Sequence, residues 1–96
     1  MTDDTVALGR NDDERRYELR LGDEVAGFIE YDERDGVLDM HHTEVDPSHG
    51  GKGFGQRLVA YALADVRDRG LTVIPTCPFI AKYIERHPDD ADLLAR

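Results

Sequence analysis

Residues 49–55 read His-Gly-Gly-Lys-Gly-Phe-Gly, and this stretch decides the fold because two different residue patterns meet there. Before it, apolar residues alternate with polar ones, which is the period of a strand with one buried face. After it, apolar residues recur every four positions from Phe54 to Val66, which is the period of an amphipathic helix. Four glycines within six positions permit left-handed backbone and leave main-chain N–H groups open to an anion. The stretch therefore predicts a strand-to-helix turn that binds an anionic ligand.

The segment upstream of the turn contains three short runs that alternate in this way. Turn residues separate the runs by only a few positions, so we expect neighbouring strands to be antiparallel. The predicted strands are 15–21, 25–32 and 37–45.

A second helical region follows the first. The β-branched run 71–74 predicts a strand that is parallel to 37–45, because a helix intervenes between the two. The next helix begins at Cys77-Pro78 and ends at His87-Pro88. The prediction is an α+β fold with an antiparallel three-strand meander, a helix, a parallel fourth strand and a C-terminal helix.

The chain has 96 residues and enough apolar material for one domain. Acidic residues dominate segment 1–14, which we expect to be a flexible arm or a ragged first strand. We expect residues 15–96 to form the folded domain.

The net charge of −9 disfavours binding to nucleic acid or to anionic lipid, because phosphate attracts the opposite sign. The sequence shows neither an apolar run long enough for a membrane span nor the pattern of a signal peptide. The single cysteine, Cys77, cannot form an internal disulfide, which agrees with a reducing compartment. We expect a cytoplasmic protein that is a monomer or a weak dimer.

The two commonest glycine-rich phosphate motifs do not fit the turn. The ATPase loop needs Ser or Thr after its lysine, whereas Gly53 follows Lys52. The dinucleotide fingerprint needs a third glycine where Gln56 stands. The anion must therefore be identified from the residues around the turn.

Those residues resemble the coenzyme A signature of the GNAT superfamily, the GCN5-related N-acetyltransferases. The signature is Arg or Gln, two residues, Gly, one residue, then Gly or Ala, and Gly53 and Gly55 match it. Gly50 stands where Arg or Gln is expected, so the charge of Lys52 or His49 would have to replace that side chain.

The resemblance extends over about 17–94 and is closest to small, one-domain members of the superfamily. These carry His-Thr-Glu-Val before the turn, here 42–45, and a cysteine before an aromatic-rich helix, here Cys77. The resemblance implies that acetyl-CoA binds where the strand 37–45 and the later parallel strand separate. It implies pantetheine contacts near Glu44 and Val45, and pyrophosphate contacts at Gly50, Gly51, Lys52, Gly53, Phe54 and Gly55.

Two residues are candidates for the chemistry, and no metal site is expected. Cys77 directly precedes Pro78, so it is expected to cap the helix, whose positive end would stabilise a thiolate. The alternative is a cysteine that only packs in the core. His42 is the candidate base, because histidine titrates near neutral pH. Strict alternation places His42 and Glu44 on one strand face, and His41 and Thr43 on the other.

We therefore expect an acetyl-CoA-dependent N-acetyltransferase that acts on an amine, either a small molecule or a protein amino group. Cys77 would be a nucleophile or an acid in this reaction. The alternative is a non-catalytic module that binds or senses acyl-CoA.

Overall fold

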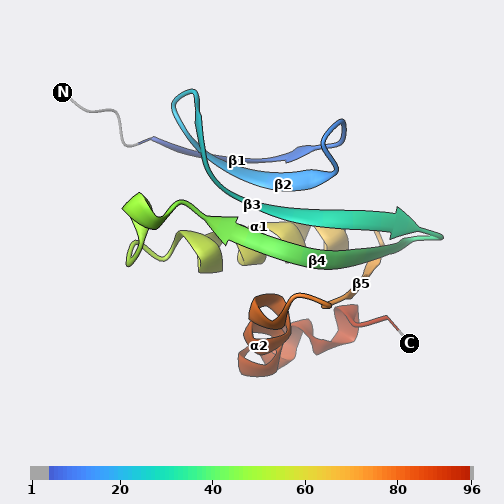
Figure 1. The fold of residues 1–96 in the computed structure, drawn as a ribbon. Helices are drawn as coiled ribbons and strands as arrows, with labels where there is room; N and C mark the ends of the chain where they lie inside the picture. The colour runs from blue at the N-terminus through green and yellow to red at the C-terminus, as the bar shows by residue number, and fades with distance from the viewer. Residues whose placement is uncertain (1–4, 96) are drawn as a thin grey trace.

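The computed structural model describes residues 5–95 and shows a five-stranded sheet packed against helices (Figure 1). The strand order is β1-β2-β3-β4-β5, with antiparallel pairs throughout except that β5 is parallel to β4. This is the predicted α+β fold with one additional strand. The elements are β1 Val6–Asn11, β2 Arg16–Leu21, β3 Glu24–Arg34, β4 Val37–Val45, the 3-10 helix η1 Pro47–His49, α1 Phe54–Asp68, β5 Thr72–Ile74, α2 Pro78–Arg86 and the 3-10 helix η2 Pro88–Leu93.

The additional strand is β1, which lies within the segment 1–14. Residues 1–4 lie outside the described residues, but Val6–Asn11 pairs along its whole length with β2. The guanidinium of Arg10 lies over the rings of Tyr17 and Tyr31, at 5.6 and 4.8 Å from their centroids. The meander therefore has four antiparallel strands, and of the two expectations for segment 1–14 the described part shows the first strand, not the flexible arm.

The turn between β3 and β4 is shorter than the predicted connection. Asp35 and Gly36 form it, and both have positive φ, at 52° and 82°. Two such residues make the turn that suits the twist of paired strands. The hairpin is therefore tight, and β3 extends to Arg34.

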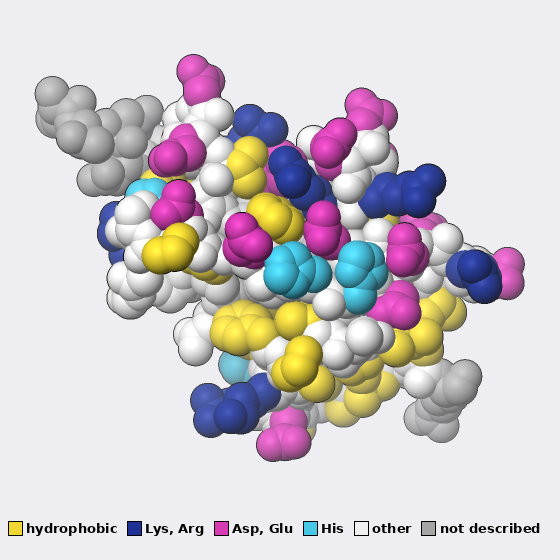
Figure 2. All heavy atoms as spheres, in the orientation of Figure 1, with side chains coloured by type: hydrophobic (Ala, Val, Ile, Leu, Met, Phe, Trp, Pro, Cys, Tyr) yellow, Lys and Arg dark blue, Asp and Glu magenta, His cyan; other side chains and the backbone are white. Residues whose placement is uncertain are grey.

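One face of the sheet packs against the helices and the other is open. The hydrophobic core is a single cluster to which the sheet, α1, α2 and η2 all contribute. Figure 2 looks onto the opposite face, which we call the open face, and shows acidic, basic and histidine side chains gathered over the strands. The buried residues of α1 are Phe54, Leu58, Val59, Ala62, Leu63 and Val66.

The strands β4 and β5 run together for only three residue pairs, from Val37 with Thr72 to Asp39 with Ile74. The chain then leaves β5, and the N–H of Cys77 donates to the carbonyl of Met40 at 2.9 Å. Beyond that bond, no other strand of the described chain pairs with this side of β4. We call this region the β4–α2 seam; it comprises Asp39, Met40, Thr43, Thr76 and Cys77.

Within residues 5–95, no helix is both long enough and apolar enough to cross a membrane.

Candidate functional site

The turn between β4 and α1 takes its shape from glycine conformations. Gly51 and Gly53 have φ of 81° and 73°, the left-handed region that other residues avoid. Gly53 is the N-cap of α1, and no side chain caps this helix start. The first turn of α1 also contains no acidic residue. The N–H groups and the positive dipole end of a 15-residue helix are therefore available to an anion.

A groove of about 520 Å³ lies over this turn. It is partly apolar and partly made of backbone, a combination that suits a ligand with both an anionic and an apolar portion. We call it the glycine groove. The residues that line it are Thr43, Val45, His49, Gly50, Gly51, Gly53, Phe54, Gly55, Gln56 and Phe79.

Gly55 allows α1 and α2 to approach each other at the wall of the groove. A Cβ at this position would lie 2.9 Å from the ring of Phe79, which is closer than real Cβ contacts. Phe79 is nevertheless 43% exposed, an unusual position for a large apolar side chain. The ring of Phe79 therefore forms an apolar wall directly beside the glycine turn.

His49 is the titratable side chain of the groove. Its side chain is 14% exposed, and its ring packs against that of Phe54 at 5.6 Å between centroids. Its Nδ1 lies 3.2 Å from Nζ of Lys52, and its Nε2 lies 3.6 Å from Glu24. Lys52 itself is not part of the lining and reaches the groove through this contact with His49.

Cys77 is the N-cap of α2, which confirms the expected position, and it is 7% exposed. Its thiol donates to Oγ1 of Thr43 at 3.5 Å. Burial by itself raises the pKa of the thiol, but hydrogen bonding with the Thr43 side chain and the nearby main chain of Ile80 and Phe79 lowers it by more. The pKa of Cys77 is therefore below the ordinary value of a cysteine, which favours the reactive thiolate.

A bulge in β4 determines toward which face of the sheet the side chains of His41 and His42 point. Glu30 of β3 pairs with His42, whereas the next residue, Tyr31, pairs with Met40. His41 is thus the extra residue on β4. Strict alternation of side chains fails at this point.

The bulge places both histidines on the open face. His41 Nε2 lies 3.6 Å from a carboxylate oxygen of Asp32, and His42 Nε2 lies 3.2 Å from one of Glu44. Thr43 points the other way, to Cys77. His42 and Glu44 do share a face as expected, but the expectation that His41 shares a face with Thr43 is wrong. The two candidate catalytic residues, His42 and Cys77, lie on opposite sides of β4.

The residues predicted from the sequence account for part of the groove lining. Six predicted residues line it, and two candidate contacts, Glu44 and Lys52, do not. Sequence reasoning placed neither Gln56 nor Phe79 there, because their position depends on how α2 packs against α1. The predicted residues in the lining are Val45, Gly50, Gly51, Gly53, Phe54 and Gly55.

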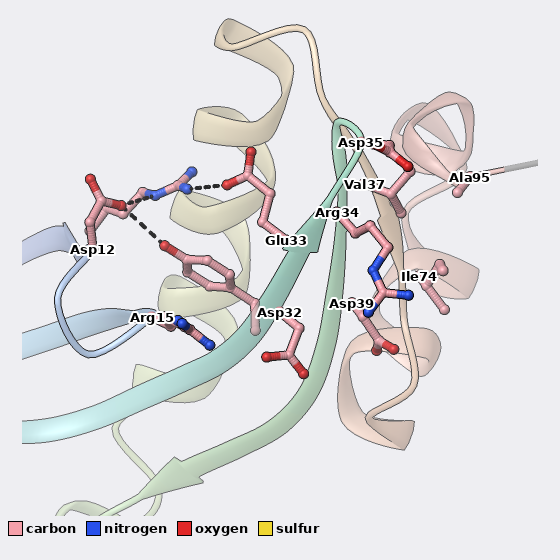
Figure 3. A pocket seen from close by; sticks show the side chains of 12 residues that line it. Asp12, Arg15, Asp32, Glu33, Arg34, Asp35, Val37, Asp39, Ile74 and Ala95 are labelled. Carbon is pink, nitrogen blue, oxygen red and sulfur yellow. Dashed lines mark hydrogen bonds and ion pairs between the residues drawn. The ribbon is translucent and has the colours of Figure 1, made fainter.

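A larger hollow, about 1080 Å³, lies at the other end of the sheet around the β3–β4 turn (Figure 3). We call it the hairpin hollow. Asp12 and Glu33 there form ion pairs with Arg10, at 2.6 and 2.8 Å. Because carboxylates outnumber arginines in its lining, the hairpin hollow is unsuited to an anionic ligand. Among residues 5–95, no group of three or more His, Cys, Asp or Glu side chains is arranged to hold a metal ion.

A family model described as GCN5-related N-acetyltransferase matches residues 16–93. The protein NATD1 of mouse and of human is 35% identical over 52 residues. That match covers 54% of this chain, and 47% and 46% of the mouse and human proteins. The chain therefore spans about half the length of the curated relatives it matches.

Solved structures share the fold at low sequence identity. A GCN5-like protein from Staphylococcus aureus superposes with a TM-score of 0.71 at 23% identity, over 99% of this chain and 91% of that one. A Bacillus subtilis acetyltransferase in complex with CoA superposes with a TM-score of 0.52 at 24% identity, over 71% of this chain and 61% of that one. The ribosomal-protein-S18-alanine N-acetyltransferase of Escherichia coli superposes with a TM-score of 0.56 at 21% identity, over 62% of this chain and 41% of that one.

Proposed function

Because the chain belongs to the GCN5-related N-acetyltransferase family, we propose that it transfers the acetyl group of acetyl-CoA to an amine. The observation that carries the proposal is the continuity of the glycine groove with the β4–α2 seam. Thr43 lines the groove and also contacts Cys77, so one strand connects an anion-binding turn to a thiol of lowered pKa. A ligand with a phosphate at one end and a thioester at the other matches that layout.

The pyrophosphate of acetyl-CoA is proposed to bind the turn from Gly50 to Gly55. Positive φ at Gly51 and Gly53 turns the backbone into the start of α1, where the uncapped N–H groups can donate to phosphate oxygens. The absence of side chains at these glycines lets the phosphate approach the backbone. Phe54 begins the helix that supplies the dipole.

The pantetheine arm is proposed to run along β4 toward the seam. Val45 and Thr43 line the groove on this side, and the opposite wall is the ring of Phe79. The backbone of β4 near Glu44 and Val45 has no neighbouring strand on the seam side within the described chain. The main-chain polar groups on that side of β4 are suited to pair with the amides of pantetheine.

Cys77 is proposed to act at the thioester in one of two ways. As an acid, its S–H gives a proton to the departing CoA thiolate while the amine attacks the carbonyl carbon directly. As a nucleophile, its thiolate attacks that carbon, the bond from carbon to CoA sulfur breaks, and the amine then takes the acetyl group from Cys77. The lowered pKa of Cys77 favours the second route, because it raises the thiolate fraction.

His42 is proposed to be the base that takes a proton from the acceptor amine. It lies on the open face with 49% of its side chain exposed, beside the Glu44 carboxylate. An amine that approaches β4 from the open face would meet His42, while Cys77 lies on the helix side of the same strand. Base and acid would then act from opposite sides of the thioester.

A second function, a non-catalytic module that binds acyl-CoA, is favoured by one observation. Position 50 is a glycine, so the turn has no side chain where the family signature has Arg or Gln. The loss of that side chain is consistent with a protein that binds acyl-CoA but does not catalyse transfer of the acyl group.

The two functions separate in one assay. The protein is incubated with acetyl-CoA and a panel of primary amines, CoA thiol release is followed, and the intact mass of the protein is recorded. Release that depends on amine supports the transferase, and an acetyl adduct lost in Cys77→Ala supports the covalent route. Tight binding without release or adduct supports the sensing module, and absence of acetyl-CoA binding contradicts both. Sedimentation of the same sample tests whether the chain is a monomer or a weak dimer, as we propose.

A further inference from the structure

Asp39 and Thr76 face each other at the point where β4 and β5 separate. The last residue pair of the two strands is Asp39 with Ile74, and both side chains border the hairpin hollow (Figure 3). Pro75 follows, and a proline has no N–H with which to continue the strand pairing. One residue later, Oγ1 of Thr76 donates to Oδ1 of Asp39 at 2.6 Å. A side-chain hydrogen bond therefore ties the chain to β4 just after the backbone pairing has ended.

This bond is the first of three contacts that hold the start of α2 against β4. After it, the N–H of Cys77 donates to the carbonyl of Met40 at 2.9 Å. The thiol of Cys77 then reaches Oγ1 of Thr43 at 3.5 Å. Because His41 is an extra residue in the strand, Met40 and Thr43 both lie on its helix side. Three positions of one strand, 39, 40 and 43, therefore fix the place of Cys77.

The Asp39–Thr76 bond acts locally rather than on the stability of the whole fold. A hydroxyl that donates to a carboxylate forms a short, charge-assisted bond, as the distance of 2.6 Å indicates. Thr76 is exposed and Asp39 is half-buried, so water competes for both groups and the net gain in stability is small. Threonine is also branched at Cβ, which restricts the rotamers of its side chain. The main consequence of the bond is therefore that it orients Thr76, the residue directly before Cys77.

We propose that Asp39 is a positioning residue for Cys77. Its carboxylate holds Thr76, and Thr76 in turn keeps the first residue of the α2 cap in place, so that the thiol stays beside Thr43. This inference rests on the proposed function, in which Cys77 acts at the thioester of acetyl-CoA. Asp39 touches neither cofactor nor acceptor in this role, and it acts through the geometry of the β4–α2 seam.

Loss of the Asp39–Thr76 bond should affect turnover more than cofactor binding. A displacement of about 1 Å at a reacting group lowers a rate by up to about 100-fold. We expect a turnover rate about tenfold lower, because Cys77 keeps its backbone bond to Met40 and is only partly displaced. Within residues 5–95, the lining of the glycine groove includes neither Asp39 nor Thr76. The KM for acetyl-CoA should therefore stay within about twofold of wild type.

The experiment compares variants that break the bond with variants that keep it. Thr76→Ala removes the donor and Asp39→Ala removes the acceptor, whereas Thr76→Ser keeps the hydroxyl. Asp32→Ala is the matched control, since Asp32 is the carboxylate opposite Asp39 on β3 and contacts His41. The first readout is the pH profile of Cys77 alkylation by iodoacetamide, which needs neither CoA nor an acceptor. The second is the turnover rate and the KM for acetyl-CoA, and thermal melts establish that each variant is folded.

We expect the alkylation midpoint of Thr76→Ala and of Asp39→Ala to rise by about half a pH unit, because a displaced thiol loses hydrogen bonding that lowers its pKa. The double variant should shift no further than either single variant, since both remove the same bond. Thr76→Ser and Asp32→Ala should match wild type in both readouts.

An unchanged alkylation profile in Thr76→Ala overturns the inference, and so does an equal shift in Thr76→Ser. Additive shifts in the double variant also overturn it, because the two residues would then act separately. If wild type releases no CoA thiol with any amine, the proposed function fails, and the alkylation profiles still decide whether Asp39 positions Cys77.

Discussion

The glycine turn and the β4–α2 seam divide the proposed site into two parts that work by different physical means. The turn uses backbone: its features are positive φ at Gly51 and Gly53 and a missing Cβ at Gly55. The seam uses side chains, namely the thiol of Cys77 and the hydroxyl of Thr43 that contacts it. Because the two parts use different groups, substitutions in the turn should mainly lower the affinity for CoA. Substitutions in the seam should mainly lower the turnover rate.

The largest expected effect is at the seam. Cys77→Ala removes the acid or nucleophile and is expected to lower the turnover rate about 100-fold, the usual contribution of a positioned proton donor or covalent group. Its affinity for CoA should stay within about twofold of wild type, because Cys77 is not part of the groove lining. Steady-state rates and calorimetry measure the two quantities. A large loss of CoA affinity in Cys77→Ala would contradict the separation of the two parts.

The next effect is at the turn. Gly53→Val forces a β-branched residue to a φ of 73°, which costs about 2 kcal/mol of stability. Distortion of the uncapped start of α1 should also weaken CoA binding by about tenfold or more. Gly9→Ala is the matched control, since a Cβ at Gly9 would meet nothing within 4 Å and the φ of Gly9 is not positive. Equal CoA affinity in Gly53→Val and the control would contradict the role of the turn.

Restoring the family signature should strengthen binding. Gly50→Gln places a polar side chain at an extended residue beside the groove, and one charge-assisted hydrogen bond to a phosphate predicts a gain of about fivefold or more in CoA affinity. Gly50→Ala is the control and should leave the affinity nearly unchanged. If Gly50→Gln binds CoA more weakly than Gly50→Ala, the pyrophosphate does not lie at this position of the turn.

The smallest effect concerns the thiol itself. Thr43→Val removes a hydrogen bond that lowers the pKa of Cys77, so the pKa should rise and the reaction with iodoacetamide should start at higher pH. The pH profile of alkylation, read by mass spectrometry, measures the change at the single cysteine. A profile that stays in place would contradict the role of the Thr43 side chain in lowering the pKa of Cys77.

The structural features behind these predictions differ in how far they can be predicted from the sequence. The turn can be predicted from sequence because its physics is local: glycines at a strand-to-helix junction need no distant partner to take positive φ. The helix cap at Cys77-Pro78 is local in the same sense. These two features, with the periodicity of α1, predict most of the fold.

Features that depend on distant contacts were not predictable. The bulge at His41 arises from the register of β3 against β4, and no residue type within β4 indicates it. The strand β1 is held by its pairing with β2 and by the contacts of Arg10 with the rings of Tyr17 and Tyr31. Phe79 forms a wall of the groove only because Gly55 lets α2 approach α1. Each depends on packing between elements that are far apart in the chain.

The central claim is that coenzyme A binds in the glycine groove, and amide chemical shifts test it most directly. A chain of 96 residues is well suited to this measurement by NMR during a titration with CoA. We expect the largest shifts at Gly51, Gly53 and Gly55, and little change around Arg10 and Arg34 of the hairpin hollow. Shifts confined to the hairpin hollow, or absent from the glycine turn at saturating CoA, would contradict the claim.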